Sequence, residues 1–305
     1  MPTAMLRRGT GYLPDVPRID DPDANSPRIA RMLAGTRFPR LTASPPPDAG
    51  IAPGGAPPAN PLPAQVDLRS GFSPVFDQGQ LGSCTANAAA GLIDYFEKAA
   101  NRSYVAPSRL FIYKVARDLA GVTGDAGAFL RTTMEALKLF GAPPESIWPY
   151  NSGAAGFNQL FDVEPTPFCY AYARNYAAVE PFRLDPLNVA SVEVLTNIKT
   201  ALAAGYPSVF GFQVYPGFEN PESGDVFFPV PGSRPSGGHA IVAAGYDDNH
   251  AIQGKNGALI VRNSWGEDWG LEGYAYMPYE YVTQGLAVDW WTMTRQDWLD
   301  TGVFD

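Results

Sequence analysis

The chain is poor in the residues and patterns that mark several common protein classes. Its 305 residues include only two cysteines, Cys84 and Cys169, so at most one disulfide can form and the core must hold the fold. No apolar run reaches the roughly 18 residues that a membrane-spanning helix needs. The N-terminus lacks the apolar core of a secretory signal. We therefore expect a soluble chain, either cytoplasmic or exported by a non-standard route.

Positive charge is also scarce. The net charge of −9 opposes binding to nucleic acid or to anionic membranes, because both favour clustered Lys and Arg side chains. Only two histidines are present, they are separated, and no clustered ligand motif accompanies them. We therefore predict no metal and no other cofactor. We further expect a monomer, with a peptide or protein as the substrate.

A segment rich in proline and glycine, residues 44 to 62, divides the chain. Its composition is that of an extended linker that cannot bury a core. Residues 1 to 43 contain seven arginines against four aspartates, a net +3, which leaves −12 on the rest because the whole chain carries −9. Ser26, Pro27 and Gly35 predict one short helix in this arm. The arm is either a disordered tail or a segment docked on the acidic body, which we take as one domain, residues 63 to 305.

Two kinds of pattern succeed one another in that domain. Residues 84 to 140 favour helices, and Ala88, Leu92, Ile93 and Phe96 share one face of the first helix. Strands are expected later in the chain, at residues 208–215, 239–247, 258–265 and 273–279. Helices followed by strands, rather than alternating with them, indicate an α+β fold with a cleft between the two layers.

Cys84 lies where a loop ends and a helix begins, in QGQLGSCTANAAAGL. A sulfur at that position meets unpaired backbone N–H groups and the positive end of the helix dipole, which favours the thiolate. A buried, inert cysteine is the alternative, because free cysteines are among the most buried residues. Cys169 has no evident partner, and we interpret it as a buried free thiol without a catalytic role.

Three further residue types complete a possible acyl-transfer site. His239 begins an apolar strand after two glycines, and its imidazole can accept the thiol proton and later protonate a leaving amine. Asn263 can orient that ring without adding charge, under the indole of Trp265. Gln78 can donate to an oxyanion together with the Cys84 backbone N–H. His239 alone would be read as a core histidine, and His250 as a solvated residue of a polar turn.

At this point the sequence resembles the papain-like cysteine proteases, peptidase family C1. The resemblance rests on QGQLGSC (78–84), GGHAIVAAGYD (237–247) and VRNSWGEDWGLEGYAYM (261–277), and it covers about residues 62 to 290. Leu81 and Thr85 stand where the family usually has a disulfide-forming cysteine and an aromatic residue. This departure fits the cysteine-poor bacterial branch of the family.

The resemblance implies a role for each motif residue and a papain-like fold, with a helical half, a β-barrel-like half and the active site between them. Cys84 would be the nucleophile and His239 the general acid/base. Asn263 would orient the imidazole, Gln78 would donate to the oxyanion, and Trp265 would shield the pair of His239 and Asn263. Trp269 would support that indole.

The substrate-binding residues are also implied by the resemblance. Gly127 and Ala128 would form the edge that pairs with the substrate backbone. Gly211, Gly238 and Ala240 would line the main side-chain pocket, which we expect to accept Leu, Val or Phe at the second position before the cut. The alternative is that these small residues serve strand packing.

The arm would then be a prosegment that blocks the cleft, and the chain a cysteine endopeptidase acting through a thioester, made as a zymogen. Two alternatives stay open. A thioester can also be resolved by an amine, as in an acyltransferase or amidase. A papain-like fold can also serve as a catalytically silent binding protein.

Overall fold

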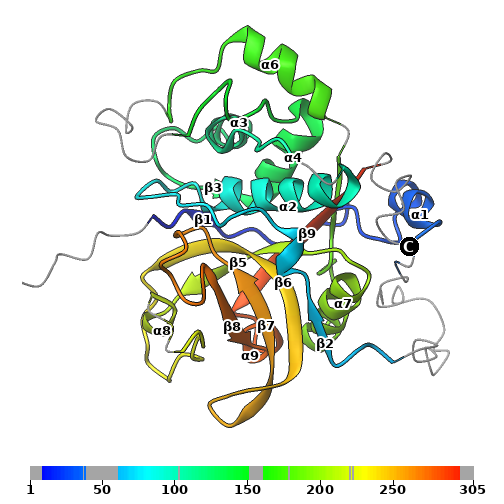
Figure 1. Cartoon of the computed structure of the whole chain (residues 1–305), viewed down its shortest axis with the longest axis vertical. Helices are drawn as coiled ribbons and strands as arrows, with labels where there is room; N and C mark the ends of the chain where they lie inside the picture. The colour runs from blue at the N-terminus through cyan, green and yellow to red at the C-terminus, as the bar shows by residue number, and fades with distance from the viewer. Residues whose placement is uncertain are drawn as a thin grey trace, which may run out of the picture.

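The structure is a computed structural model that describes residues 9–36, 38, 61–101, 104–150, 161–177, 179–219, 221 and 223–295. The predicted linker, 44 to 62, lies outside these ranges except for its last two residues. The chain forms two layers with a segment of the N-terminal arm running between them (Figure 1). This arrangement confirms the predicted α+β, papain-like class of fold.

The helical layer is built around one long central helix. Its helices are α2 (Cys84–Asn101), α3 (Arg109–Ala120), α4 (Leu130–Phe140) and α6 (Pro167–Ala173). The predicted apolar face of α2 is buried, with Leu92 and Phe96 fully inaccessible to solvent. Ser108 begins α3 by accepting a hydrogen bond from the Phe111 N–H, and Gly121 ends it with φ +66. α2 faces the β layer, so it is the element from which Cys84 reaches the boundary between the layers (Figure 1).

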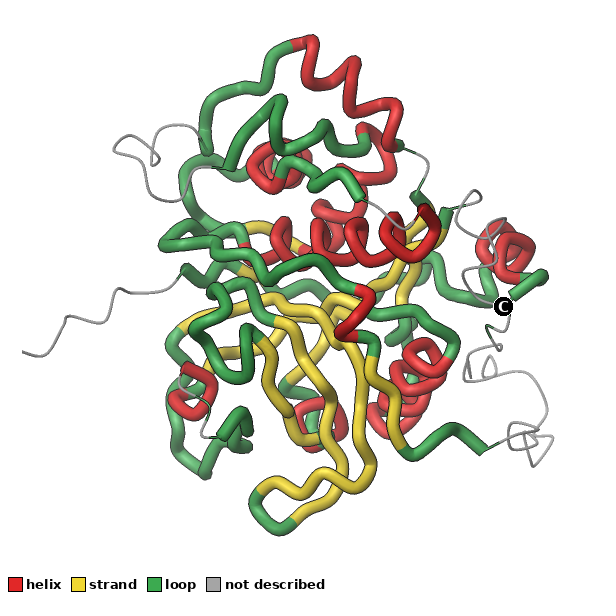
Figure 2. Tube along the Cα trace, in the orientation of Figure 1, coloured by secondary structure: helices red, strands yellow, loops and turns green. Residues whose placement is uncertain are grey.

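The β layer is a single seven-stranded sheet (Figure 2). The strand order is β4 (Glu180–Arg183), β9 (Ala287–Thr294), β5 (Ser208–Val214), β6 (Gly237–Ile252), β7 (Lys255–Arg262) and β8 (Tyr274–Pro278), and β2 (Gln65–Asp67) pairs with β6. All pairings in this sheet are antiparallel. The expected barrel-like half is an open sheet, because β4 and β8 stand at opposite ends of its path among the described strands. Helices α7 (Ser191–Ala203), α8 (Pro216–Glu219) and α9 (Glu280–Thr283) accompany it.

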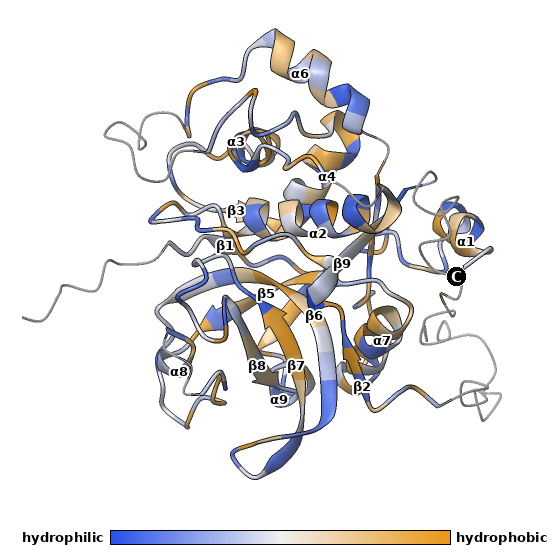
Figure 3. Ribbon diagram, in the orientation of Figure 1, coloured by the Kyte–Doolittle hydropathy of each residue, from blue (hydrophilic) through white to orange (hydrophobic). Residues whose placement is uncertain are grey.

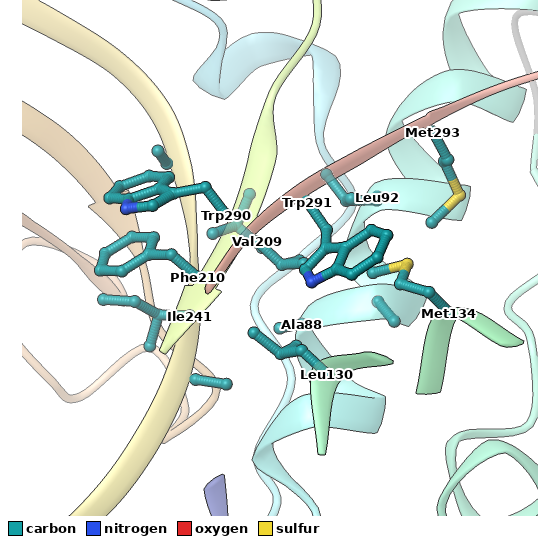
Figure 4. Close-up of a cluster of buried hydrophobic side chains, with 14 of the residues drawn as sticks. Ala88, Leu92, Leu130, Met134, Val209, Phe210, Ile241, Trp290, Trp291 and Met293 are labelled. Carbon is teal, nitrogen blue, oxygen red and sulfur yellow. The ribbon is translucent and has the colours of Figure 1, made fainter. Parts of the chain in front are cut away.

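The apolar core lies on both faces of the sheet, one of which faces the helical layer (Figure 4). Phe210 of β5 stacks on Trp290 of β9, with ring centroids 4.0 Å apart. The neighbouring Trp291 turns the other way, toward Met134 of α4 and Leu92 of α2 (Figure 4). Successive residues of β9 thus serve both sides of the sheet, as the twofold side-chain alternation of a strand requires. Strands β5 and β7 are mainly apolar, whereas the tip where β6 meets β7 is polar (Figure 3).

The arm is anchored at its far end by a short helix, α1 (Pro27–Leu33). Ile29 and Leu33 are buried, and the ring of Phe38 lies edge-on to Tyr206 with centroids 4.7 Å apart. Ser26 precedes the helix as predicted, although its side chain does not cap it. Of the two alternatives for the arm, the segment docked on the body is therefore the correct one for this part of the chain, and the disordered tail is not.

A buried ionic cluster joins the strands at one end of the sheet. The guanidinium of Arg183 is fully buried and contacts the carboxylates of Asp185, at 3.0 Å, and Asp289, at 2.9 Å. Burial raises the pKa of Asp185 to about 6, even though Arg183 acts in the opposite direction. Buried charges of this kind are tolerated only while each keeps its partner.

We expect Arg183→Met to lower the free energy of unfolding by about 3–5 kcal/mol, because it leaves two buried carboxylates without their cation. Lys255→Met is the matched control, since that lysine pairs with Glu280 from a side chain that is 61% exposed. Its expected effect is below about 1 kcal/mol. Urea unfolding of the intact chain measures the free energy of unfolding of both variants. Equal effects of the two substitutions would contradict the role of Arg183 as the partner of buried carboxylates.

Candidate active site

Cys84 is the first residue of α2 and is completely buried. Backbone N–H groups of Thr85, Ala240 and Gly11 favour its thiolate, as a sulfur at a helix start should experience. Burial has the larger effect, however, and raises the pKa of the Cys84 thiol to about 12. The predicted position at a helix start is confirmed, whereas burial opposes the predicted thiolate while the site is covered.

His239 lies on β6, fully buried, and its Nε2 is 2.8 Å from Asn263 Oδ1. An amide oxygen only accepts hydrogen bonds, so Nε2 carries the proton of the neutral ring. Nδ1 has no hydrogen-bond partner among the described residues. It is therefore not bonded to the Cys84 sulfur, although Ala240, the next residue of β6, lies against that sulfur. Burial lowers the pKa of His239 to about 4, so the ring is neutral at pH 7.

The rings of Trp265, Phe218 and Phe212 pack against the imidazole, and Trp269 packs against Trp265. Trp265 stacks on His239 with centroids 4.7 Å apart and planes at 27°. Trp269 stands at right angles to Trp265, at 6.2 Å, as a support for that indole. Phe218 of α8 contacts all three rings, at 4.9 to 5.7 Å. No motif in the sequence marked Phe218, because its role depends on a loop folding back over the site.

Gln78 is oriented by a residue that sequence reasoning missed. Ser264 Oγ donates to Gln78 Oε1 at 2.6 Å, which leaves the Nε2 donor group directed at the cleft. That Nε2 donates to the carbonyl oxygens of Leu81, at 2.8 Å, and of Gly9 in the arm, at 3.2 Å. Ser264 lies next to Asn263 in the sequence and belongs to the same motif. The motif did not indicate that Ser264 orients the Gln78 side chain.

The arm passes directly over these groups. Trp265 Nε1 donates to the Gly9 carbonyl at 3.0 Å, and the Gly11 N–H donates to the Gly238 carbonyl at 2.9 Å. On the other side the Ala128 N–H donates to the Gly11 carbonyl at 2.8 Å. The strand β1 (Tyr12–Leu13) then continues in parallel with β3 (Ala128–Phe129). The arm therefore occupies the edge that was predicted to bind the substrate backbone.

The approach of the arm requires residues without side chains. A Cβ atom on Gly11 would lie 2.0 Å from the Gly82 carbonyl oxygen, and one on Gly9 would lie 2.2 Å from the Leu81 oxygen. On the body, a Cβ on Gly127 would lie 2.2 Å from the Gly11 oxygen, and Gly127 also has φ +84. These separations are far below any normal carbon–oxygen contact, so backbone packs on backbone.

Two of the residues predicted to line a pocket, Gly211 and Gly238, lie against Tyr12. A Cβ on Gly211 would lie 2.0 Å from that ring, and a Cβ on Gly238 would lie 2.3 Å from the Tyr12 carbonyl oxygen. Ala240 is buried and pairs with Gly211 across the sheet. The Tyr12 hydroxyl and Asp289 Oδ2 are both buried without a hydrogen-bond partner among the described residues. Burial, with Asp289 adding to it, raises the pKa of Tyr12.

The two remaining residues singled out in the sequence lie apart from this site. Cys169 is a buried free thiol, as predicted. His250 was expected in a solvated turn, and that prediction is wrong. It lies on β6, stacks on Tyr276 at 3.8 Å, and its Nε2 is 2.7 Å from Asp225 Oδ1. The turn begins three residues later, at Gln253, because β6 and β7 extend further than the apolar pattern does.

In the described part of the chain, no group of His, Cys, Asp and Glu side chains is placed to hold a metal ion. No described helix has both the length and the apolar character required to cross a bilayer.

Comparisons with known proteins agree with this architecture. The sequence model of the papain family cysteine proteases matches residues 62–289. A peptidase C1-like protein of Acanthamoeba polyphaga mimivirus is 38% identical over 222 residues, which cover 70% of this chain and 68% of the relative. Procathepsin L of Mus musculus is 26% identical over 70% of this chain and 59% of its own length.

Among solved structures, xylellain, a cysteine protease from Xylella fastidiosa, superposes with a TM-score of 0.69 and 33% identity. The match covers 96% of this chain and 99% of that chain. The fold and these matches define a cysteine-type peptidase, a hydrolase. The chain belongs to the papain family of cysteine proteases.

We expect Cys84 of the intact chain to react with iodoacetamide at pH 7.5 at least about a hundredfold more slowly than in the urea-unfolded chain. Only the thiolate reacts, and a pKa near 12 leaves about a thousandth of the thiolate present at a pKa of 9. Mass spectrometry of the Cys169→Ser variant, which has a single thiol, measures both rates. Similar rates in the two states would contradict the burial argument.

Proposed function

We propose that the chain is a cysteine endopeptidase that hydrolyses peptide bonds through a thioester, with Cys84 as nucleophile. The observation that carries the proposal is the His239 ring itself. Its Nε2 is bonded to Asn263 under the Trp265 indole, and its Nδ1 carries no hydrogen bond. Nδ1 is thus the nitrogen available to the thiol on α2. An imidazole fixed in this tautomer can act first as a base and then as an acid.

The reaction follows from these positions. The Cys84 proton moves to Nδ1 as the sulfur attacks the scissile carbonyl, and the carbonyl oxygen becomes an oxyanion. Gln78 Nε2 and the Cys84 N–H donate to that oxygen. The carbon–nitrogen bond then breaks, and the leaving amine takes the proton from Nδ1. Water, giving a proton to Nδ1, finally attacks the thioester and releases the acid and the thiol.

We further propose that residues 1–43 and the linker 44–62 form a prosegment, and residues 63–305 the catalytic domain. The arm covers the predicted substrate edge at Ala128 and takes up the Gln78 donor. It also keeps water from Cys84 and His239, whose buried pKa values leave both neutral. Latency in this proposal is both steric and electrostatic, because an ion pair of thiolate and imidazolium needs a solvated cleft.

The predicted side-chain pocket stays part of the proposal. Gly211 and Gly238 leave the space that the Tyr12 ring occupies, which supports a pocket of apolar or aromatic preference, with Leu, Val or Phe at the second position before the cut. The carboxylate of Asp289 faces the Tyr12 hydroxyl at the end of this space. A side chain that ends in a hydrogen-bond donor therefore fits the pocket as well as a purely apolar one.

Gly11→Val tests the latency. We expect little turnover of a fluorogenic peptide by the intact wild-type chain, and high turnover once the linker is cut and the arm removed. Valine at residue 11 would overlap the Gly82 carbonyl, so this variant should turn over substrate without any cut. Gly35→Val is the matched control within the arm, because a Cβ there meets no atom within 4 Å. Equal turnover by intact and cut wild-type chains would rule out blocking.

Gln78→Ala and Cys84→Ser test the chemistry in the cut chain. We expect Gln78→Ala to lower kcat by about a hundredfold to a thousandfold, because one oxyanion donor is lost. Cys84→Ser should abolish both turnover and labelling by an epoxide inhibitor of cysteine proteases. A silent binding protein would show no turnover in the wild-type chain. An acyltransferase would form mainly the amide product when an amine is added.

A further inference from the structure

Arg131 is a buried cation whose hydrogen-bond partners all belong to the arm. It is the second residue of α4, and its side chain is 8% exposed. Nε bonds Asp15 Oδ2 at 2.5 Å, and Nη2 bonds the Val16 carbonyl and Asp21 Oδ2, each at 3.0 Å. Nη1 contacts the other oxygen of Asp21. Within the described part of the chain, no residue of the body accepts a hydrogen bond from this guanidinium.

Arg183 provides the contrast. It also contacts Asp21 of the arm, at 3.5 Å, but it keeps Asp185 and Asp289 of the body at 3.0 and 2.9 Å. When the arm leaves, Arg183 stays paired and Arg131 loses every anion. Arg131 then retains only the face of Trp291, 5.6 Å from its guanidinium carbon. A guanidinium does not lose its proton in proteins, so the open cleft presents an unpaired positive charge.

The position of Arg131 places this charge on the path of a bound peptide. The arm passes the sulfur of Cys84 at Gly11, fills the pocket at Gly211 with Tyr12, and reaches Arg131 with Asp15. Arg131 is the second residue after β3, the edge to which the arm backbone is bonded. Along the path of the arm, the order is therefore Cys84, then the pocket at Gly211, then Arg131.

We propose that Arg131 forms a carboxylate-binding subsite of the open cleft, which favours substrates with Asp or Glu three to six residues before the cut. The proposal rests on the proposed peptidase function. The ligand is a side-chain carboxylate, because the fork of a guanidinium matches two carboxylate oxygens, as Asp21 shows. We expect the preference to be local, because the chain outside the arm carries a net charge of −12 and would otherwise repel acidic peptides.

The test uses the full chain, folded with its arm, whose linker is then cut within residues 44–62 and whose arm is removed. Fluorogenic peptides carry one hydrophobic residue at the second position and a single Glu or Gln at the third, fourth, fifth or sixth. We expect kcat/KM about tenfold higher for Glu than for Gln at one of these positions, through KM, and a smaller ratio in 0.5 M salt.

Variants of the same chain identify the residue responsible. Arg131→Gln should bring the ratio of Glu to Gln peptides close to one, and Arg131→Glu should favour a Lys peptide instead. Arg174→Gln, which removes one exposed arginine from the turn Arg174–Tyr176, is the control for net charge and should keep the ratio.

A ratio near one at every position in the wild-type chain would overturn the subsite, and so would a ratio unchanged in Arg131→Gln. In both cases the Gln peptides are still cut, and the peptidase function stands. Failure to cut any peptide would overturn the function and the subsite together.

Discussion

Gly11 of the arm is hydrogen-bonded to both layers of this molecule. Its N–H donates to Gly238 of the β layer, and its carbonyl accepts from Ala128 at the edge of the helical layer. Both bonds need the arm backbone to lie against the body, which a side chain at this position would prevent. These two hydrogen bonds fix the arm at Gly11. The pairing of β1 with β3, the position of the Tyr12 ring and the contact of Asp15 with Arg131 follow in the next residues of the arm.

The same contact sets the charge state of the site. With the arm in place, water has no access to Cys84 or His239, and desolvation holds both in their neutral forms. The helix start and the N–H groups of Thr85 and Ala240 belong to the body, whereas the Gly11 N–H belongs to the arm. In the proposed zymogen, removal of the arm would return solvent to Cys84 and His239 and so reduce the burial that keeps both groups neutral.

Much of the site could be predicted from the sequence, because its residues lie in contiguous motifs. Cys84 at a helix start and His239 on an apolar strand follow from local patterns, and Asn263 with Trp265 from a single short block. Local patterns cannot predict desolvation, so they did not indicate the burial that opposes a thiolate at Cys84 in the covered state. Phe218 was missed for a similar reason, since only the folded loop brings it to the rings.

The strands show the same division. β5 to β8 were predicted from alternating apolar runs, whereas β4 and β9 were not. The buried charges Arg183 and Asp289 interrupt the apolar pattern of those two strands. They are compatible with burial because they pair with each other and Arg183 also pairs with Asp185. His250 was misplaced because the hairpin of β6 and β7 is polar at its tip. The role of Arg131 depends on Asp15 and Asp21, more than a hundred residues away along the chain.

The anchorage of α1 has a kinetic consequence. Ile29, Leu33 and Phe38 are packed on the body, and Arg28 contacts Glu180, so the far end of the arm is held independently of the cleft. Scission of the linker converts an intramolecular contact into a complex of two chains without breaking any of these bonds. Escape of the fragment is then governed by its own dissociation rate and by dilution. If the arm acts as the proposed prosegment, a cut molecule would stay inhibited longest where the protein is most concentrated.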